Sequence, residues 1–403
     1  MQQPLEGMRV VDLTRALAGP FCTMMLGDLG ADVVKVERPG RGDESRGWGP
    51  PFVGEPYGPY PGESAYFIAT NRNKRSVTVN LKSPEGQAVV RDLAARSDAF
   101  VENFRTGALD ELGLGYDNLK AVNPGLIYCS ISGYGRTGPH ARRPGYDFVI
   151  QAEGGMMGIT GPEEGPPYRV GVPIVDITAG MFAATAILAA LRARDVTGQG
   201  QLVDVSLLDT QAALLTNVAS NYLVGGEAPR RLGNAHPNIA PYEAFRARDR
   251  WFGLAAANQG QWLTLCRVID RPDLGEDPRF VSNSERLANR GALVNELNEA
   301  FATRDADEWL ASLGEAGLPC GPINTVREVF DHPQAEAREM VLEVEHPSAG
   351  ALQLPGFPYK LSGTPAAVHR PPPRLGEHTE EVLAERLGYS PERVAELKGR
   401  GVL

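Results

Sequence analysis

The chain has 403 residues, of which 42% are apolar and 22% charged, and its formal net charge is −10. This composition is typical of a folded globular protein with room for two or three domains. The negative charge disfavours nucleic acid and anionic membranes as partners, because both select basic faces. The first residues lack a basic stretch followed by an apolar one, so we expect no signal peptide and a cytoplasmic protein.

The cysteines and the longest apolar run both indicate a soluble protein with these residues buried in its core. No Cys-x-x-Cys pair occurs among the four cysteines, Cys22, Cys129, Cys266 and Cys320. Their spacing fits neither a zinc site nor a disulfide framework, so we expect buried free thiols and no metal. The apolar run 174–191 contains Asp176 and many small residues. We interpret it as a buried helix and not as a membrane span.

Strands and helices alternate through the first half of the chain. Runs rich in β-branched residues predict strands at 8–13, 31–36, 76–81, 98–101, 126–132 and 201–207. Helices are expected between them, at 20–29, from Ser83-Pro84 onward and at 174–191, because Ser is a favoured N-cap and Pro a favoured first helical residue. Strands joined by helices predict a parallel sheet with right-handed crossovers.

The pattern changes after a linker at 225–231, which is rich in Gly, Pro and charge. Short strands such as 251–256 then alternate with amphipathic helices at 262–269, 290–302 and 305–316. Near the end, a Pro-rich extended segment at 355–374 precedes a helix at 379–386. The predicted fold class is α/β, with a large Rossmann-like parallel-sheet domain (1–224), a smaller α+β domain (225–330), and a return segment (331–403) that completes the large domain.

Basic residues recur where the predicted strands end. Ligands of parallel α/β sheets bind outside the carboxyl ends of the strands. Arg binds phosphate bidentately and Lys binds it as a point charge, so the basic residues there could hold a polyanionic nucleotide; they are Arg38, Lys82, Arg105, Arg142 and Arg143. The alternative for each is a solvated surface charge. No dinucleotide-type or P-loop glycine motif follows a strand, so side chains would have to hold the ligand.

Asp176 stands in an apolar stretch, Pro173-Ile174-Val175-Asp176, at the apparent start of a helix. A carboxylate there is either an N-cap or a functional group. Burial would raise its pKa, and the helix N-terminus would lower it. An ionised but poorly solvated carboxylate is a competent nucleophile. Its position in the sequence does not decide between a capping role and a functional role.

Eight segments together resemble one known family. They are LEGMRVVDLTRALAGP, GADVVKVERPG, NRNKRSVTVNLKSPEG, VENFRTGALDELGLG, PGYDFVIQAEGG, VDITAG, GPINTVREVFDHPQ and LGEHTEEVL, in that order over nearly the whole chain. The chain is similar in all of them to the family III CoA-transferases (the CaiB/BaiF family), which include formyl-CoA transferase and carnitine CoA-transferase. The resemblance implies transfer of CoA from an acyl-CoA donor, succinyl-CoA by family habit, to a free carboxylic acid, without a metal or organic cofactor.

The resemblance also implies roles for individual residues. Asp176 occupies the position of the catalytic aspartate, which forms an anhydride with the donor acyl group and then an aspartyl-CoA thioester. The implied contacts with CoA are Leu17, Ala18, Arg38, Val79, Lys82, Asn103, Phe104, Arg105, Arg143 and Tyr146. The family's fold implies an obligate homodimer of two interlocked ring-like subunits.

This chain departs from the family pattern at two places. Some members carry a basic residue just before the Gly-Leu-Gly at 113–115, where this chain has Glu111 and Leu112, so Arg105 or Arg143 would have to substitute. The loop 233–241 stands where some members have a glycine-rich lid. His236 or His378 could approach an active site, although loop histidines are more often structural.

Three other functions compete with CoA transfer. An α-methylacyl-CoA racemase would have the same fold, but racemases use a His with an Asp, and this chain has Tyr146-Asp147 at the His-Asp position. A CoA-binding protein without turnover would not need Asp176. A nicotinamide dehydrogenase lacks its glycine fingerprint here. The donor and acceptor acids cannot be predicted, because distant segments assemble the pocket that selects them.

Overall fold

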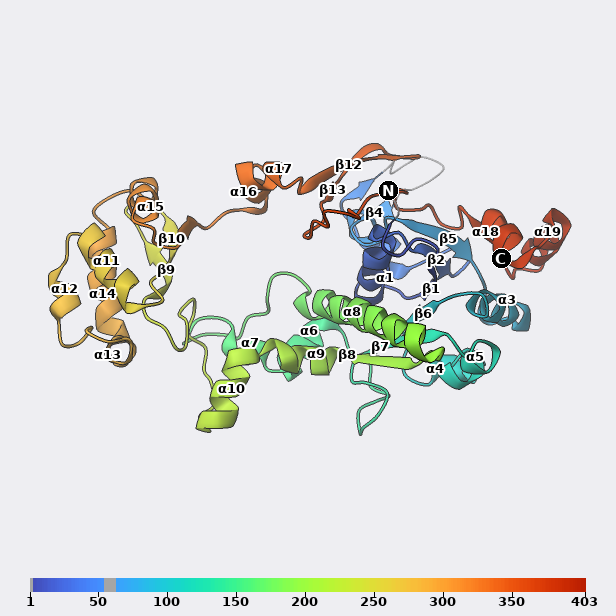
Figure 1. Cartoon of the computed structure of the whole chain (residues 1–403), viewed down its shortest axis with the longest axis horizontal. Coiled ribbons are helices and arrows are strands. Elements are labelled where there is room, and N and C mark those ends of the chain that lie inside the picture. The colour runs from blue at the N-terminus through green and yellow to red at the C-terminus, as the bar shows by residue number, and fades with distance from the viewer. Residues whose placement is uncertain (1–2, 54–62) are drawn as a thin grey trace. The chain divides into compact units, whose positions relative to one another are not determined.

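A computed structural model of the chain describes residues 3–53 and 63–403 (Figure 1). These residues form two compact units. Unit 1 comprises Met1–Gly155, Val170–Leu215 and Gln334–Leu403, and unit 2 comprises Met156–Arg169 and Thr216–Pro333. The expected domains (1–224, 225–330 and 331–403) stay a prediction, since a compact unit is not by itself a domain that folds alone.

Unit 1 is built on the predicted parallel sheet, whose six strands have the order β5-β2-β1-β6-β7-β8. The strands are β1 (Arg9–Leu13), β2 (Asp32–Glu37), β5 (Lys74–Thr78), β6 (Ala99–Glu102), β7 (Ile127–Ser132) and β8 (Leu202–Ser206). Each pairs in parallel with its neighbour, and Val10 lies between Val33 and Ala99. All six carboxyl ends therefore lie at one edge. The strand expected at 76–81 lies earlier, because the chain turns at Asn80, whose side chain accepts a hydrogen bond from the Lys82 N–H.

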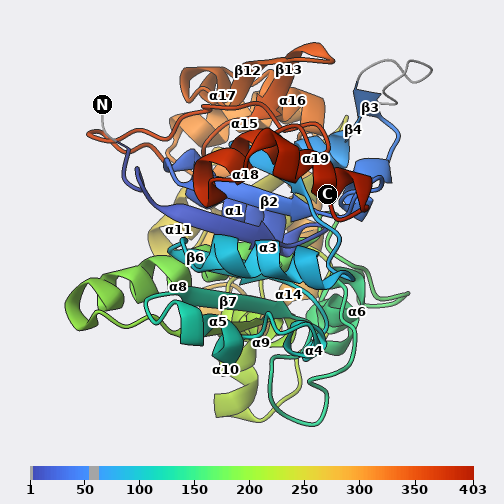
Figure 2. The same cartoon turned by 90° about the vertical axis from the view of Figure 1, so that its right-hand side faces the viewer.

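Helices cover both faces of this sheet. Val10 and Val11 point to opposite faces, as neighbours in a strand do, and belong to different cores. Helices α1 (Ala18–Asp28) and α8 (Ile174–Thr197) pack on the Val10 side. The Val11 side packs against α3 (Pro84–Ala94) and the C-terminal helices α18 (Thr379–Leu387) and α19 (Pro391–Gly399), so the end of the chain lies beside α3 (Figures 1 and 2).

Shorter elements complete unit 1. They are a 3₁₀ turn η1 (Glu44–Gly47), β3 (Phe52–Val53), β4 (Glu63–Ser64), α2 (Ala65–Ile68), α4 (Ala108–Glu111), α5 (Tyr116–Val122), α6 (Asp147–Glu153), α9 (Leu207–Leu214), and the antiparallel pair β12 (Val341–His346) and β13 (Gly350–Pro355). The predicted N-cap is confirmed, since Ser83 accepts a hydrogen bond from the Gly86 N–H and Pro84 opens α3. The β12–β13 hairpin and α19 were not predicted.

Unit 2 has the mixture of short strands and helices that the sequence predicts. Its antiparallel sheet has the order β11-β10-β9, formed by β9 (Tyr242–Arg246), β10 (Trp251–Ala255) and β11 (Cys320–Pro322). Its helices are α7 (Met156–Ile159), α10 (Thr216–Gly225), α11 (Gln259–Val268), α12 (Asp273–Glu276), α13 (Asn283–Ala288), α14 (Arg290–Phe301), α15 (Ala306–Glu315) and α16 (Val326–Phe330), followed by α17 (Pro333–Ala337) where the chain returns to unit 1. Its core combines leucines with phenylalanine and tryptophan side chains.

Helix α8 is only partly the buried helix that the apolar run predicts. Among the described residues it alone is long and apolar enough to cross a membrane by length and composition, and 39% of its apolar window is buried. Ala179, Ala183 and Ile187 lie in the core of unit 1, whereas Met181 and Phe182 are exposed. The expectation of buried thiols holds for three cysteines, but Cys320 is partly exposed.

Candidate active site

Asp176 is the third residue of α8, and its carboxylate does not cap the helix. The N-cap residue, Pro173, has no side chain that can accept a hydrogen bond. The carboxylate of Asp147 takes this role, because its Oδ1 accepts hydrogen bonds from the backbone N–H groups of Val175 (2.9 Å) and Asp176 (3.4 Å). Gln151 holds the other oxygen of Asp147 at 2.7 Å. The structure thus excludes capping as the role of the Asp176 side chain.

The Asp176 carboxyl lies in an environment that disfavours its charge. No residue in the described part of the chain donates a hydrogen bond to it. Burial, with a smaller contribution from the nearby charge of Asp147, raises the pKa of Asp176 to about 7. The group therefore changes charge near neutral pH, and its ionised form is poorly solvated.

Two glycines bring Asp147 to this position. Gly133 follows β7 and Gly145 precedes α6, and their backbones touch: a Cβ at Gly133 would lie 2.7 Å from the Gly145 Cα. No side chain fits between them. This close approach fixes the start of α6 against the end of β7, from where Asp147 reaches the N-terminus of α8.

A third glycine sets α8 against the start of α1. Gly180 lies one turn after Asp176 on the same side of α8, and a Cβ there would lie 2.6 Å from the backbone oxygen of Ala18. Helix α1 begins at Ala18 after Leu17, without a side-chain cap, so its first N–H groups are open. The side chains of Leu17 and Ala18 are buried. Their backbone is thus the part that a ligand could contact.

The loop after β6 is joined to the loop after β1. The Asn103 side chain accepts a hydrogen bond from the Arg15 N–H (2.9 Å) and donates one to the Arg15 carbonyl (2.7 Å). The Arg15 guanidinium also lies over the Phe104 ring, 4.6 Å from its centroid. The structure therefore brings Asn103 and Phe104 beside the segment that holds Leu17 and Ala18.

The predicted phosphate-binding side chains divide into free and paired groups. Arg38, Lys82 and Arg105 follow β2, β5 and β6 at the same edge of the sheet, and all three are exposed. Within residues 3–53 and 63–403 none of them forms an ion pair. Arg143 instead pairs with Glu153 at 3.1 Å. Arg105 is therefore better placed than Arg143 to substitute for the basic residue missing at 111–112.

Val79 and Tyr146, two other predicted contacts with CoA, differ in their exposure. Val79 is buried in the core, where it faces the helices that cover the sheet. Its N–H donates to the Glu37 carbonyl at 2.8 Å, which leaves its own carbonyl as the backbone group that a ligand could contact. Tyr146, which directly precedes Asp147 at the start of α6, is 68% exposed, so its side chain is open to a ligand.

Tyr66, in α2, is a further candidate residue that the sequence did not predict. Its ring packs edge-on against Trp48, with 5.1 Å between the ring centroids. Burial raises the pKa of Tyr66 to about 12, and the charges of Asp176, Asp147 and Asp43 contribute in that order. The phenol is therefore close to the acidic pair and stays protonated at neutral pH. No pattern in the sequence singles out this tyrosine from the eleven others.

The two candidate histidines, His236 and His378, both form hydrogen bonds with nearby backbone groups, which gives each a structural role. The His236 ring accepts a hydrogen bond from the Asn238 N–H within the 233–241 loop of unit 2. Arg290 also anchors this loop, since it donates to the His236 carbonyl at 2.6 Å. His378 accepts a hydrogen bond from the Ser76 N–H, and burial lowers its pKa. The lid role of 233–241 stays a prediction.

The described residues offer no cluster of His, Cys, Asp and Glu that could hold a metal ion.

Comparison with known proteins assigns the family. A family model described as CoA-transferase family III matches residues 5–379. The chain belongs to the family III CoA-transferases. The resemblance inferred from the eight sequence segments is therefore confirmed.

Curated relatives of this CoA-transferase match it over at least 93% of its length. It is 45% identical over 401 residues to the succinyl-CoA:glutarate CoA-transferase of Homo sapiens, a match that covers 100% of this chain and 90% of that protein. It is 43% identical to the succinate–glutarate CoA-transferase of Agrobacterium fabrum, covering 95% of each. It is 41% identical to the acetyl-CoA:oxalate CoA-transferase of Acetobacter aceti, covering 93% of each. The chain is thus an enzyme that transfers CoA between acyl-CoAs and carboxylic acids.

Solved structures agree with this assignment. A CaiB/BaiF family protein from Brucella suis has a TM-score of 0.84 at 44% identity, covering 96% of this CoA-transferase and 100% of that chain. Rv3272 from Mycobacterium tuberculosis has a TM-score of 0.82 at 36% identity, covering 94% and 98%. The relatives named for CoA transfer, and not the shared fold, favour transfer over racemisation or binding without turnover.

Proposed function

We propose that this enzyme moves CoA from succinyl-CoA to a small dicarboxylic acid through covalent intermediates on Asp176. Relatives named for succinyl-CoA, glutarate and oxalate support the donor and the acceptor class. The observation that supports Asp176 most directly is its carboxylate at the start of α8, which has no described hydrogen-bond donor and a raised pKa.

The proposed transfer takes four steps. The Asp176 carboxylate attacks the thioester carbon of succinyl-CoA, the C–S bond breaks, and CoA leaves as a thiolate. The thiolate then attacks the Asp176 acyl carbon of the resulting anhydride and releases succinate, which leaves an aspartyl-CoA thioester. The acceptor carboxylate displaces CoA from this thioester to form a second anhydride. The thiolate finally attacks the acceptor's acyl carbon, which yields the new acyl-CoA and the free carboxylate. Splitting the exchange in this way replaces one difficult step by easier ones.

The surroundings of Asp176 suit these steps. A carboxylate with a pKa of about 7 is about half ionised at neutral pH, and its poor solvation favours attack. Charge then develops on the oxygen of the attacked carbonyl. The open N–H groups of the first turn of α1, which Gly180 holds against α8, are suitable donors for that oxygen. The neutral Tyr66 hydroxyl is a further donor close to the acidic pair.

The same edge of the sheet would hold CoA. We assign contacts to the backbone at Leu17, Ala18 and Val79 and to the side chains of Asn103, Phe104 and Tyr146. Phosphate binding falls to the cations Arg38, Lys82 and Arg105, with Arg143 in a lesser role. No metal or organic cofactor is needed for this chemistry.

We also propose that two chains form the interlocked homodimer that the family resemblance implies, and that the enzyme is cytoplasmic. Exposed apolar side chains on α6 and α8 support an interface there: Phe148 is 57%, Met181 46% and Phe182 45% exposed. Burial of such side chains is the main favourable contribution to permanent interfaces.

The experiment that tests the function combines succinyl-CoA with a panel of free carboxylic acids. New acyl-CoA species and any CoA adduct on the peptide containing Asp176 are followed by mass spectrometry, beside Asp176→Asn. We expect new thioesters with dicarboxylic acids, an adduct at Asp176, and neither in the variant. Transfer by Asp176→Asn would overturn the mechanism. Loss of stereochemistry at C2 of a 2-methylacyl-CoA without any transfer would favour the racemase.

A further inference from the structure

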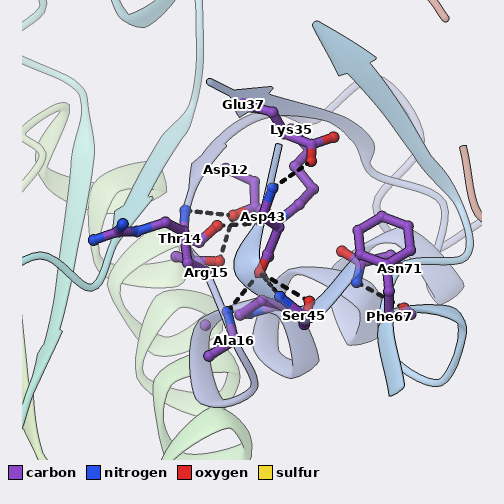
Figure 3. Close-up of polar contacts among 12 residues, drawn as sticks. Asp12, Thr14, Arg15, Ala16, Lys35, Glu37, Asp43, Ser45, Phe67 and Asn71 are labelled. Atoms are coloured by element: carbon purple, nitrogen blue, oxygen red, sulfur yellow. Dashed lines mark hydrogen bonds and ion pairs between the residues drawn. The ribbon is translucent and has the colours of Figure 1, made fainter. Parts of the chain in front are cut away.

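The turn 14–16, which joins β1 to α1, is held by side chains at five successive backbone groups. Figure 3 labels three of the residues that hold it, Asp12, Lys35 and Asp43. Asp12 accepts a hydrogen bond from the Thr14 N–H at 2.9 Å, and Lys35 donates to the Thr14 carbonyl at 2.9 Å. Asn103 bonds both backbone groups of residue 15, as described above. Asp43 accepts a hydrogen bond from the N–H of residue 16 at 3.1 Å. Side chains from four separate segments therefore fix one short turn.

Two of these side chains form an ion pair that is closed to solvent. The Lys35 Nζ and the Asp43 Oδ2 lie 2.9 Å apart, and both side chains are 0% exposed. Burial alone would raise the pKa of Asp43, but the Lys35 charge and several hydrogen bonds outweigh it and hold the pKa below its usual value. Replacing a buried ion pair by apolar residues is often neutral or stabilising. Stability alone therefore does not explain why this pair is here.

The turn needs such support because its backbone is strained. Ala16 has a φ of +67°, a left-handed conformation that is unfavourable for a residue with a Cβ. The hydrogen bond to Asp43 restrains Ala16 immediately before α1 begins. Without it, the direction in which the first turn of α1 points would no longer be fixed.

Asp43 also organises the aromatic side of the site. It caps the 3₁₀ turn η1, where its Oδ1 accepts hydrogen bonds from the Ser45 N–H (2.9 Å) and the Ser45 hydroxyl (2.8 Å). Trp48 directly follows η1 and packs against Tyr66. One buried carboxylate thus fixes both the start of α1 and the Trp48–Tyr66 pair.

We propose that Lys35 and Asp43 are positioning residues for CoA transfer, which hold the 14–16 turn so that the open N–H groups of α1 face the acyl group carried by Asp176. The inference rests on the proposed function of Asp176. Neither residue touches a substrate, since both are enclosed by protein. Their effect should therefore fall on the transition state more than on the binding of succinyl-CoA, because small displacements of catalytic groups are costly to the rate.

The test compares Asp43→Asn and Lys35→Met with a matched control, Asp28→Asn. Asp28 pairs with Arg72 at 2.6 Å, and both side chains are at most 5% exposed, but the pair lies at the far end of α1 and holds the C-terminal segment. We expect the first two variants to lose kcat at least about tenfold, with the KM for succinyl-CoA changed less than about threefold. The control, whose buried carboxyl has a raised pKa, removes a buried ion pair away from the 14–16 turn and should keep kcat within about twofold. Hydrogen exchange of the peptide spanning 14–18 should rise only in the first two variants.

The outcomes separate this inference from the proposed function. Inactivity of Asp176→Asn together with an unchanged kcat in Asp43→Asn overturns the positioning role alone. Transfer by Asp176→Asn overturns the proposed function whatever Asp43→Asn does. A milder variant, Ser45→Ala, removes one hydrogen bond to Asp43 and serves if Asp43→Asn does not fold. It should lower kcat about threefold, and an unchanged kcat there also contradicts the inference.

Discussion

The carboxylate of Asp147 caps the helix that carries Asp176, so two acidic side chains share the N-terminus of α8. Asp147 is stabilised by hydrogen bonds from Gln151 and from the backbone N–H groups of Val175 and Asp176. Asp176 has no such donors in the described part of the chain. The two carboxylates thus differ in their environment, because the helix N–H groups donate hydrogen bonds to Asp147 and not to Asp176.

Asp147→Asn should shift the pH dependence of catalysis. The amide oxygen can still cap α8, but the charge that adds to the effect of burial on the pKa of Asp176 is gone. The pKa of Asp176 should fall, and the acidic limb of kcat/KM, expected near pH 7 in the wild type, should move to lower pH. A pH profile of succinyl-CoA turnover measures this. Asp147→Ala removes the cap as well and should cost about 1 kcal/mol of stability; an unmoved limb in Asp147→Asn would mean that another group titrates.

Asp176→Asn should stabilise the fold while abolishing transfer. The carboxyl has a pKa of about 7 in the folded chain against 3.8 as its ordinary value, so the folded state binds the proton more tightly. Ionisation therefore costs stability as the pH rises above about 4, fully so above about 7. Allowing for partial exposure, we expect a gain of about 1–3 kcal/mol at pH 8 that shrinks toward pH 4. Urea unfolding at pH 8, 6 and 4 measures it, and a gain independent of pH would contradict the raised pKa.

Tyr66→Phe should lower kcat about tenfold and leave the KM for succinyl-CoA nearly unchanged. The hydroxyl stays protonated at every working pH, and it lies within range of the charge of Asp176, the proposed nucleophile. Steady-state kinetics with one good acceptor acid measure the effect. Tyr359→Phe is a matched control, because the pKa of Tyr359 is also raised to about 12 by burial but its neighbours are Asp28 and Arg72. Equal losses in both variants would argue for a general packing effect.

Arg105→Ala should weaken the binding of CoA substrates more than Arg143→Ala. Arg105 is exposed and has no described ion-pair partner, whereas Arg143 is engaged by Glu153. We expect the KM for succinyl-CoA to rise about tenfold in the first variant and about threefold in the second. Comparing succinyl-CoA with its 3′-dephospho analogue locates the contact. Preference for the phosphorylated donor should disappear in Arg105→Ala, and its retention would place that phosphate elsewhere.

Gly180→Ala should destabilise unit 1 and reduce activity. The added Cβ would lie 2.6 Å from the Ala18 carbonyl oxygen and 3.2 Å from the Cys22 nitrogen, both backbone atoms of α1, so α8 would have to move away from α1. Overpacking of this kind costs about 1–3 kcal/mol. Gly291→Ala, in helix α14 with nothing near its added Cβ, should be neutral or stabilising. Thermal unfolding and kcat are compared for both; a neutral Gly180→Ala would show that the α1–α8 contact can relax.

The amino-acid sequence determined the elements of the large sheet and the candidate nucleophile. Strand and helix periodicities are properties of neighbouring residues, so β1, β2, β6, β7 and β8 lie within one or two residues of their predicted bounds. The Ser83-Pro84 start of α3 was predicted for the same reason. Asp176 stood out because a carboxylate in an apolar run is unusual in any fold.

Only the tertiary structure decided what surrounds the Asp176 carboxylate. The cap of α8 comes from Asp147, 29 residues earlier, and no local pattern predicts a hydrogen bond across that distance. The same holds for Tyr66 beside the acidic pair and for Asp43, which reaches the 14–16 turn from another segment. Periodicity specifies which face of an element is buried, whereas the charge state of a buried side chain depends on every group that folding packs around it.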